Sequence, residues 1–191
     1  MNHSIFLSGT TVDLAVITRD MADNSRWWHW FNDEHITFNT QHHYHPNTPE
    51  AQLEFFENLR KDKTKLQLAV IHKKDQVLIG MVSLNRINHQ HRKCEISGII
   101  GERKYQNLLC ATEAFKLLLI QAFDQLNMHR VSGGTLIPEV VDMFVRLLGF
   151  QPEGVFRQDV FKNGRYMDIY RVGLLKEEFD SFRHKTKTEP M

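Results

Sequence analysis

Apolar residues recur every three or four positions between Asn107 and Leu126, which predicts a helix with one buried face. The buried stripe consists of Leu108, Ala111, Phe115, Leu118, Leu119, Ala122 and Leu126. Two further helices are expected over 48–60 and 138–148, because each opens on a proline followed by a glutamate. These three helices account for much of the apolar surface that a core requires.

Shorter apolar runs, separated by polar turns, predict β-strands. The expected strands are 12–17, 66–71, 77–84, 93–100, 130–135, 155–161 and 166–172. Asn163-Gly164, between the last two, is typical of a tight hairpin. An aromatic segment at 24–33 has the length of another helix. Runs of strands interrupted by helices predict an α+β fold, in which helices flank a mixed β-sheet.

The length of 191 residues suits one domain, which we place at 1–183. The polar tail at 184–191 is expected to fray. Just before it, LLKEEFDSF has apolar and acidic residues at helical spacing. An amphipathic helix is therefore expected there, packed on its own domain or, as the alternative, on a partner protomer.

Composition narrows the class of protein. Apolar residues make up 41% and charged residues 25%, which argues against intrinsic disorder. The net charge of +1 disfavours nucleic acid as a partner, and no apolar run is long enough to cross a membrane. The N-terminus does not resemble a signal peptide. Cys94 and Cys110 are expected to be reduced and buried, so the sequence favours a cytoplasmic protein.

A turn before the long helix is the first candidate binding site. Residues 101–107 join a predicted strand to a helix N-terminus, where backbone N–H groups and the helix dipole attract anions. Arg103 and Lys104 add positive charge at its rim. The turn therefore favours a phosphate group as its ligand.

Longer segments carry a resemblance to a known family. EISGIIGERKYQN, ATEAFKLLLIQAF, LNMHRV and LLGFQPEGVFR, with NGRYMD, resemble the GNAT superfamily of N-acetyltransferases. WWHWFNDEHIT and PNTPEAQLEFFENL look like the first two helices of the branch that contains ribosomal-protein N-terminal and nucleotide-amino-sugar acetyltransferases. The resemblance covers about residues 11–180. It implies a mixed sheet splayed open between the Glu95 and Arg130 strands, with acetyl-CoA as co-substrate in that cleft.

The resemblance also implies which residues contact the co-substrate. Pantetheine would pair with the backbone at Ile99 and Ile100, and pyrophosphate would lie on the turn and the first helical residues. That set is Lys104, Tyr105, Gln106, Asn107, Leu108, Leu109, Cys110 and Ala111. Asn107 and Leu109 stand where the family has glycines. Asn tolerates positive φ, and the Leu109 side chain has to point away from the pyrophosphate.

The strand that lines the implied cleft offers a catalytic base. Glu95 is the candidate, acting on the amine directly or through water. The alternative is a structural ion pair between Glu95 and Arg92 or Arg130. A tyrosine acid found in the family is not carried over, because Val145 occupies its position and Pro138 replaces a preceding asparagine.

The resemblance implies that the acceptor meets the aromatic segment and the loop that follows it. The candidate substrate contacts are Trp30, Asn32, His35, His43 and Arg86, with Tyr44 and His45 as neighbours of the same loop. At most one of the three tryptophans is expected to reach the acceptor, since such a group is more often core. The histidines lie in a polar loop without cysteine, so no metal site is expected.

These features predict an N-acetyltransferase that moves acetyl from acetyl-CoA to a primary amine by direct attack, without an acyl-enzyme. The favoured acceptor is a nucleotide-linked amino sugar, and the rival acceptor is a protein N-terminus. The other class of hypothesis is a GNAT-like binding module without activity, suggested by Leu109, Pro138 and Val145. A homodimer is a further expectation.

Overall fold

A computed structural model describes residues 3–40 and 44–188, and its centre is an eight-stranded mixed sheet. The strand order is β1-β2-β3-β4-β5-β6-β8-β7, and only β5 and β6 run parallel. The strands are β1 (Ile5–Ser8), β2 (Val12–Val16), β3 (Leu66–His72), β4 (Val77–Asn88), β5 (Lys93–Ile100), β6 (Arg130–Thr135), β7 (Gln151–Lys162) and β8 (Arg165–Leu175). The seven predicted strands are confirmed, and β1 was missed.

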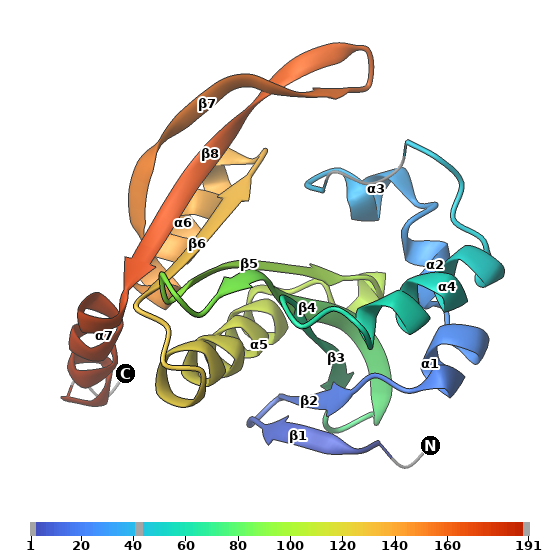
Figure 1. Cartoon of the computed structure of the whole chain (residues 1–191), viewed down its shortest axis with the longest axis horizontal. Coiled ribbons are helices and arrows are strands. Elements are labelled where there is room, and N and C mark those ends of the chain that lie inside the picture. The colour runs from blue at the N-terminus through green and yellow to red at the C-terminus, as the bar shows by residue number, and fades with distance from the viewer. Residues whose placement is uncertain (1–2, 41–43, 189–191) are drawn as a thin grey trace.

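Helices cover both faces of this sheet, as the α+β prediction requires (Figure 1). They are α1 (Arg19–Asn24), α2 (Trp27–Trp30), α3 (Glu34–Thr37), α4 (Pro49–Leu59), α5 (Leu108–Ile120), α6 (Pro138–Leu148) and α7 (Lys176–Thr188). A 3-10 turn, η1 (Arg103–Tyr105), precedes α5, and a π-helical segment, η2 (Gln121–Gln125), follows it. Among the described residues, we find no helix whose length and apolar character would let it span a membrane.

The sheet splits between β5 and β6. The two strands pair only from Lys93–Arg130 to Glu95–Ser132, and beyond that point they diverge, as Figure 1 shows. β6 continues instead as the antiparallel partner of β8 through Thr135. The remaining part of β5 pairs only with β4, on its other side. One edge of β5 is therefore left open in the middle of the sheet.

Two apolar cores hold the helices on the sheet. The first lies under α5 and α6 and includes both cysteines, which are free and buried as predicted. The second lies on the opposite face, where α1, α2 and α4 pack through Met21, Trp27 and Phe56, respectively. Burial of these large side chains supplies the main driving force for closing the helices over the strands.

The aromatic segment does not form the single helix expected over 24–33. Helix α1 ends where Ser25 adopts an extended conformation and donates its hydroxyl to Met21 O at 2.5 Å. Asp33 then starts α3, accepting N–H bonds from His35 and Ile36. Serine and aspartate favour such caps over helix interiors, so the segment breaks into short pieces.

The C-terminal helix packs on its own domain, which confirms the first of the two expectations for it. Phe179 is buried and stacks on Phe123 of η2. Lys176 and Arg183 form ion pairs with Asp124 of the same segment. Helix α7 extends to Thr188, so it includes the first part of the tail expected to fray.

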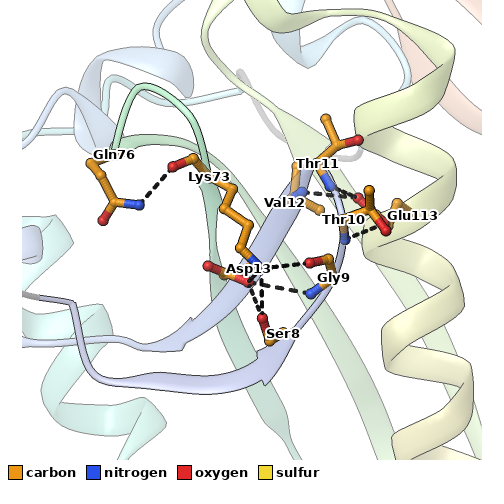
Figure 2. A network of polar contacts seen from close by, with 9 residues as sticks. All are labelled: Ser8, Gly9, Thr10, Thr11, Val12, Asp13, Lys73, Gln76 and Glu113. Atoms are coloured by element: carbon orange, nitrogen blue, oxygen red, sulfur yellow. Dashed lines mark hydrogen bonds and ion pairs between the residues drawn. The ribbon is translucent and has the colours of Figure 1, made fainter.

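A carboxylate ties the N-terminal hairpin to α5 (Figure 2). Glu113 accepts the backbone N–H groups of Thr10, Thr11 and Val12 at 2.7, 2.7 and 2.9 Å. Burial alone would raise the pKa of Glu113, but these hydrogen bonds outweigh it, and the pKa lies below the usual 4.5. The ionised carboxylate thus holds the β1–β2 turn against the helix that starts at the open edge.

We predict that Glu113→Gln lowers the free energy of unfolding at pH 7 by roughly 2–3 kcal/mol, because a neutral amide cannot accept three N–H bonds as strongly. The contribution of Glu113 is complete above the unfolded pKa near 4.5 and disappears as the pH falls through the lower folded value. Urea unfolding at pH 7 and at pH 3 measures both effects. The exposed Glu54→Gln is the control, and equal losses in the two variants would contradict the assignment.

Candidate active site

A cavity of about 620 Å³ lies on the α2–α4 face of the sheet and reaches the gap between β5 and β6. Polar residues on alternate strand positions form its floor, since side chains two apart share a face. They are Gln67 on β3, Ser83 and Asn85 on β4, and Glu95 and Ser97 on β5. Phe31, Asn39, His45, Asn47 and Gln52 line the cavity from the helical side, and Gly133, Gly134 and Arg171 from β6 and β8.

The centre of the floor is a hydrogen-bonded triad. The hydroxyls of Ser83 and Ser97 lie 2.8 Å apart, and Asn85 Nδ2 donates to both, at 3.1 and 2.9 Å. These residues are held in register across β4 and β5. The triad gives the cavity a fixed, polar floor next to Glu95.

Glu95 lies at the last residue pair before β5 and β6 separate. Its Oε1 accepts from Arg86 at 3.2 Å and lies 3.5 Å from Arg171 Nη2. The alternative expectation of an ion pair is therefore realised, but the partners differ from those expected: Arg92 bonds Asn127 and Arg130 bonds Glu153. Two guanidinium groups therefore contact this carboxylate.

The open edge of β5 presents backbone groups to the gap. Arg92 O accepts from His129 N and Arg130 N, and Gly101 N donates to Ile79 O of β4. The backbone N–H and C=O groups of successive strand residues point to opposite edges of the strand. Those of Ile96, Gly98 and Ile100 therefore face the gap. The backbone of Ile99 instead faces β4, and its side chain lines the cavity, which corrects its expected role.

The turn before α5 differs from the expected phosphate cradle. Asn107 has φ −132°, so it does not use positive φ, and its Oδ1 caps the helix by accepting Cys110 N–H at 2.9 Å. The N–H groups of Tyr105, Gln106 and Asn107 bond within the turn. Gln106 Nε2 also donates to Ile100 O at 2.9 Å, on the open edge.

Two helical residues leave their N–H groups available. Leu108 and Leu109 lie at the first positions of α5, where no intrahelical acceptor exists, and the described residues supply no other. These two residues are 55% and 63% exposed, so the Leu109 side chain contacts solvent. Ala111 N bonds Asn107 O inside the helix.

Ion pairs hold the basic residues of the turn. Arg103 Nη2 lies 2.8 Å from Asp33, and Lys104 Nζ lies 3.8 Å from Asp75. The buried Tyr105 donates its hydroxyl to the same Asp75 at 2.6 Å, a bond that raises the pKa of Tyr105. Tyr105 therefore anchors the turn to the β3–β4 connection.

Trp30 packs against Gly101 in the turn before α5 and does not line the main cavity. It is 2% exposed, and its Nε1 donates to Glu102 at 3.1 Å. Any Cβ at position 101 would overlap the Trp30 indole, so glycine is required there. Trp30, expected to contact the substrate, is thus a core residue that fixes the path of the chain from β5 to α5. It lies beside a second cavity of about 610 Å³.

The other expected acceptor contacts fall in different places. Asn32 bonds the Asn47 backbone at 2.7 Å in both directions, so it positions a residue that lines the cavity. His35 is exposed outside it, and Arg86 reaches the site only through Glu95. His43 lies outside the described residues. Of its neighbours, His45 does line the cavity.

The loop over the cavity is tied to the other half of the sheet. Lys162 is 3% exposed and its Nζ donates to Thr37 O and Thr40 O at 2.6 and 2.7 Å. Tyr44 donates to Phe161 O at 2.9 Å. Asn163 and Gly164 both have positive φ, as a tight hairpin requires, and they place these contacts at the β7–β8 tip.

No cluster of three potential metal ligands occurs in the described ranges 3–40 and 44–188. His42 and His43 lie outside these ranges. Cys94 is not a nucleophile of the site either, because burial raises the pKa of its thiol to about 12.

The polar floor went unnoticed in the sequence although a signal was present. Gln67, Ser83, Glu95 and Ser97 alternate with apolar residues inside three predicted strands. Asn85 continues this alternation one residue beyond the strand predicted over 77–84. Such alternation beneath covering helices marks a polar cavity floor, since an ordinary core would be apolar there.

Comparison with known proteins places the chain in a family. A family model described as an acetyltransferase (GNAT) domain matches residues 14–137. A spermidine N(1)-acetyltransferase of Escherichia coli K12 is 32% identical over 110 residues, which are 56% of this chain and 57% of that protein. An uncharacterized N-acetyltransferase of Bacillus subtilis, YnaD, is 28% identical over 133 residues, 69% of this chain and 76% of that one.

Solved structures agree on the fold. The crystal structure of spermidine N-acetyltransferase from Vibrio cholerae, in complex with CoA and spermine, superposes with a TM-score of 0.81. It is 23% identical and covers 90% of this chain and 99% of its own. The sequence match spans only 57% of the Escherichia coli relative's length. The matched family model and the splayed sheet together show that this chain belongs to the GNAT acetyltransferase family.

Proposed function

We propose that this protein transfers the acetyl group of acetyl-CoA to a primary amine. The observation that carries the proposal is the separation of β5 from β6 beyond Glu95, next to the N-terminus of α5 and to a polar cavity. Family membership supports it, as do the relatives named N-acetyltransferases.

The open edge of β5 fits a pantetheine arm. Amide groups of such an arm would pair with the backbone of Ile96 and Gly98, which have lost their strand partner. The pyrophosphate would meet the N–H groups of Leu108 and Leu109 at the positive end of α5. Asn107 already occupies the N–H of Cys110, so we expect fewer backbone contacts to phosphate than a glycine-rich turn provides.

Glu95 is proposed as the base. The amine nitrogen attacks the thioester carbonyl carbon, its proton passes to Glu95 directly or through water, and the C–S bond breaks as CoA thiolate leaves. Glu95 lines the cavity at the end of the β5–β6 pairing, where Arg86 and Arg171 contact its carboxylate. A thiolate is a good leaving group that water can protonate, so the valine at position 145 does not prevent this route.

The acceptor class has several candidates. The resemblance of GVFR and NGRYMD to nucleotide-amino-sugar acetyltransferases favours a nucleotide-linked amino sugar over a protein N-terminus, and the names of the relatives add spermidine. All three present a primary amine to the same cavity. The three acceptors differ in net charge, so charged residues that line the cavity can discriminate among them.

Acetyl-CoA is expected to bind in the micromolar range in calorimetric titration, with desulfo-CoA as the reference ligand. Leu109→Glu should weaken this binding at least about tenfold, because it puts a carboxylate beside the phosphates. Ile5→Glu is the control, since it makes the same change at an exposed apolar residue of β1. Absence of binding at millimolar acetyl-CoA would refute the acetyltransferase and leave a GNAT-like binding module.

Glu95→Gln should lower kcat/KM by roughly 10²–10⁴-fold while the Kd of acetyl-CoA stays unchanged, since only proton transfer is lost. Thiol release with an amine acceptor, followed at several pH values, measures the effect. Glu54→Gln, at an exposed helical carboxylate, is the matched control. A Glu95→Gln enzyme with full activity would show that another group takes the proton.

A further inference from the structure

The charges that line the acceptor cavity are mostly basic. Among the described residues, its titratable lining consists of His45, Lys65, Glu95 and Arg171. Glu95 is the one carboxylate in this set, and it forms ion pairs with Arg171 and with Arg86 from just outside. Its charge is therefore compensated, and the described part of the lining carries more basic than acidic side chains.

Lys65 is a basic group without a polar partner in the described ranges 3–40 and 44–188. It immediately precedes β3 and is half-buried, and its Nζ lies 4.8 Å from the centre of the Phe55 ring. Burial lowers the pKa of Lys65, and only the attraction of Asp62 acts the other way. The ammonium group has lost part of its hydration, which a bound anion can replace.

Two amide side chains of the cavity lining add unused hydrogen-bonding capacity. Gln52 is 2% exposed, and its Nε2 is buried without a partner among the described residues. Oε1 of Gln67, a floor residue on β3, is also buried without a partner among the described residues. Buried amide atoms without partners are uncommon and point to a polar ligand or water at the site.

The strand register places Lys65 at a defined separation from Glu95. Leu66 faces Leu84 on β4, so Lys65 faces Asn85, which in turn faces Glu95 on β5. Two strand spacings make this separation roughly 10 Å. An acceptor whose amine lies at Glu95 can therefore extend along the polar floor to Lys65.

We propose that the acceptor is an amine that also carries an anionic group, a carboxylate or a phosphate, and that Lys65 binds this group. The proposal rests on the acetyltransferase function proposed above and specifies its substrate class. It also implies discrimination against polyamines. In the cavity, Lys65 and Arg171 would repel a polycation. Glu95 is the one described carboxylate that could attract it, and its charge is already compensated, so repulsion exceeds attraction.

Matched acceptor pairs test the proposal. Thiol release from acetyl-CoA is measured with glycine and glycinamide, with glucosamine 6-phosphate and glucosamine, with a UDP-linked amino sugar, and with spermidine. We expect the anionic member of a pair to have a kcat/KM at least about tenfold higher, from one charge-assisted contact. The carboxylate and phosphate pairs distinguish the two sources of the anion.

Lys65→Met should remove this preference, lowering kcat/KM for anionic acceptors at least about tenfold more than for neutral ones. Lys65→Arg should restore most of it. Lys63→Met, at an exposed lysine two residues away, is the control, and thermal melting checks that each variant is folded. The Kd of acetyl-CoA should be the same in all of them.

The outcomes separate the two levels of the proposal. If acetyl-CoA does not bind and no acetylated amine is detected by mass spectrometry, the acetyltransferase function itself fails. If amines are acetylated but spermidine or the neutral member of each pair is preferred, the function stands and the anionic acceptor is refuted. An anion preference that survives in Lys65→Met would refute the role of Lys65.

Discussion

The parting of two parallel strands is the constraint on which the rest of the structure depends. β5 and β6 pair for three residues and then separate, so one strand edge is unsatisfied inside the sheet. An open edge at that place is tolerated only because a ligand or water can supply hydrogen-bond partners there. The cavity, the position of Glu95 and the accessibility of the α5 N-terminus all follow from this divergence.

Contacts distant in sequence hold the two halves of the sheet at their separation. Lys162, at the tip of the β7–β8 hairpin, donates to carbonyls at the end of α3 and just after it. Asn39 accepts from Thr135 and Leu136, where β6 ends. On the other face, α5 packs in one core with α6. Polar contacts therefore bound the gap between β5 and β6 on the side of α3, and apolar packing bounds it on the side of α5 and α6.

The sequence predicted the strands and long helices well, because their periodicity reflects burial along one element. The site was predicted less well, because it depends on partners that periodicity does not reveal. Trp30 looked like an acceptor contact, and its burial follows from Gly101, seventy-one residues later in the chain. The ion pair between Glu95 and Arg171 was not expected, because Arg171 comes from a strand that joins the rest of the sheet through β6. Lys65 carried no local signal, since its neighbours in the cavity come from β4 and α4.

The cap on α5 has a consequence for how folding and ligand occupancy are related. Where a helix N-terminus is completed by a phosphate, part of the helix's stability depends on the ligand. Here the Asn107 side chain supplies an internal acceptor for Cys110, and the N–H groups of residues 105–107 are satisfied within the turn. In the first turn of α5, the N–H groups of Leu108 and Leu109 are left for a ligand. The order of the helix is therefore largely independent of what the cleft contains.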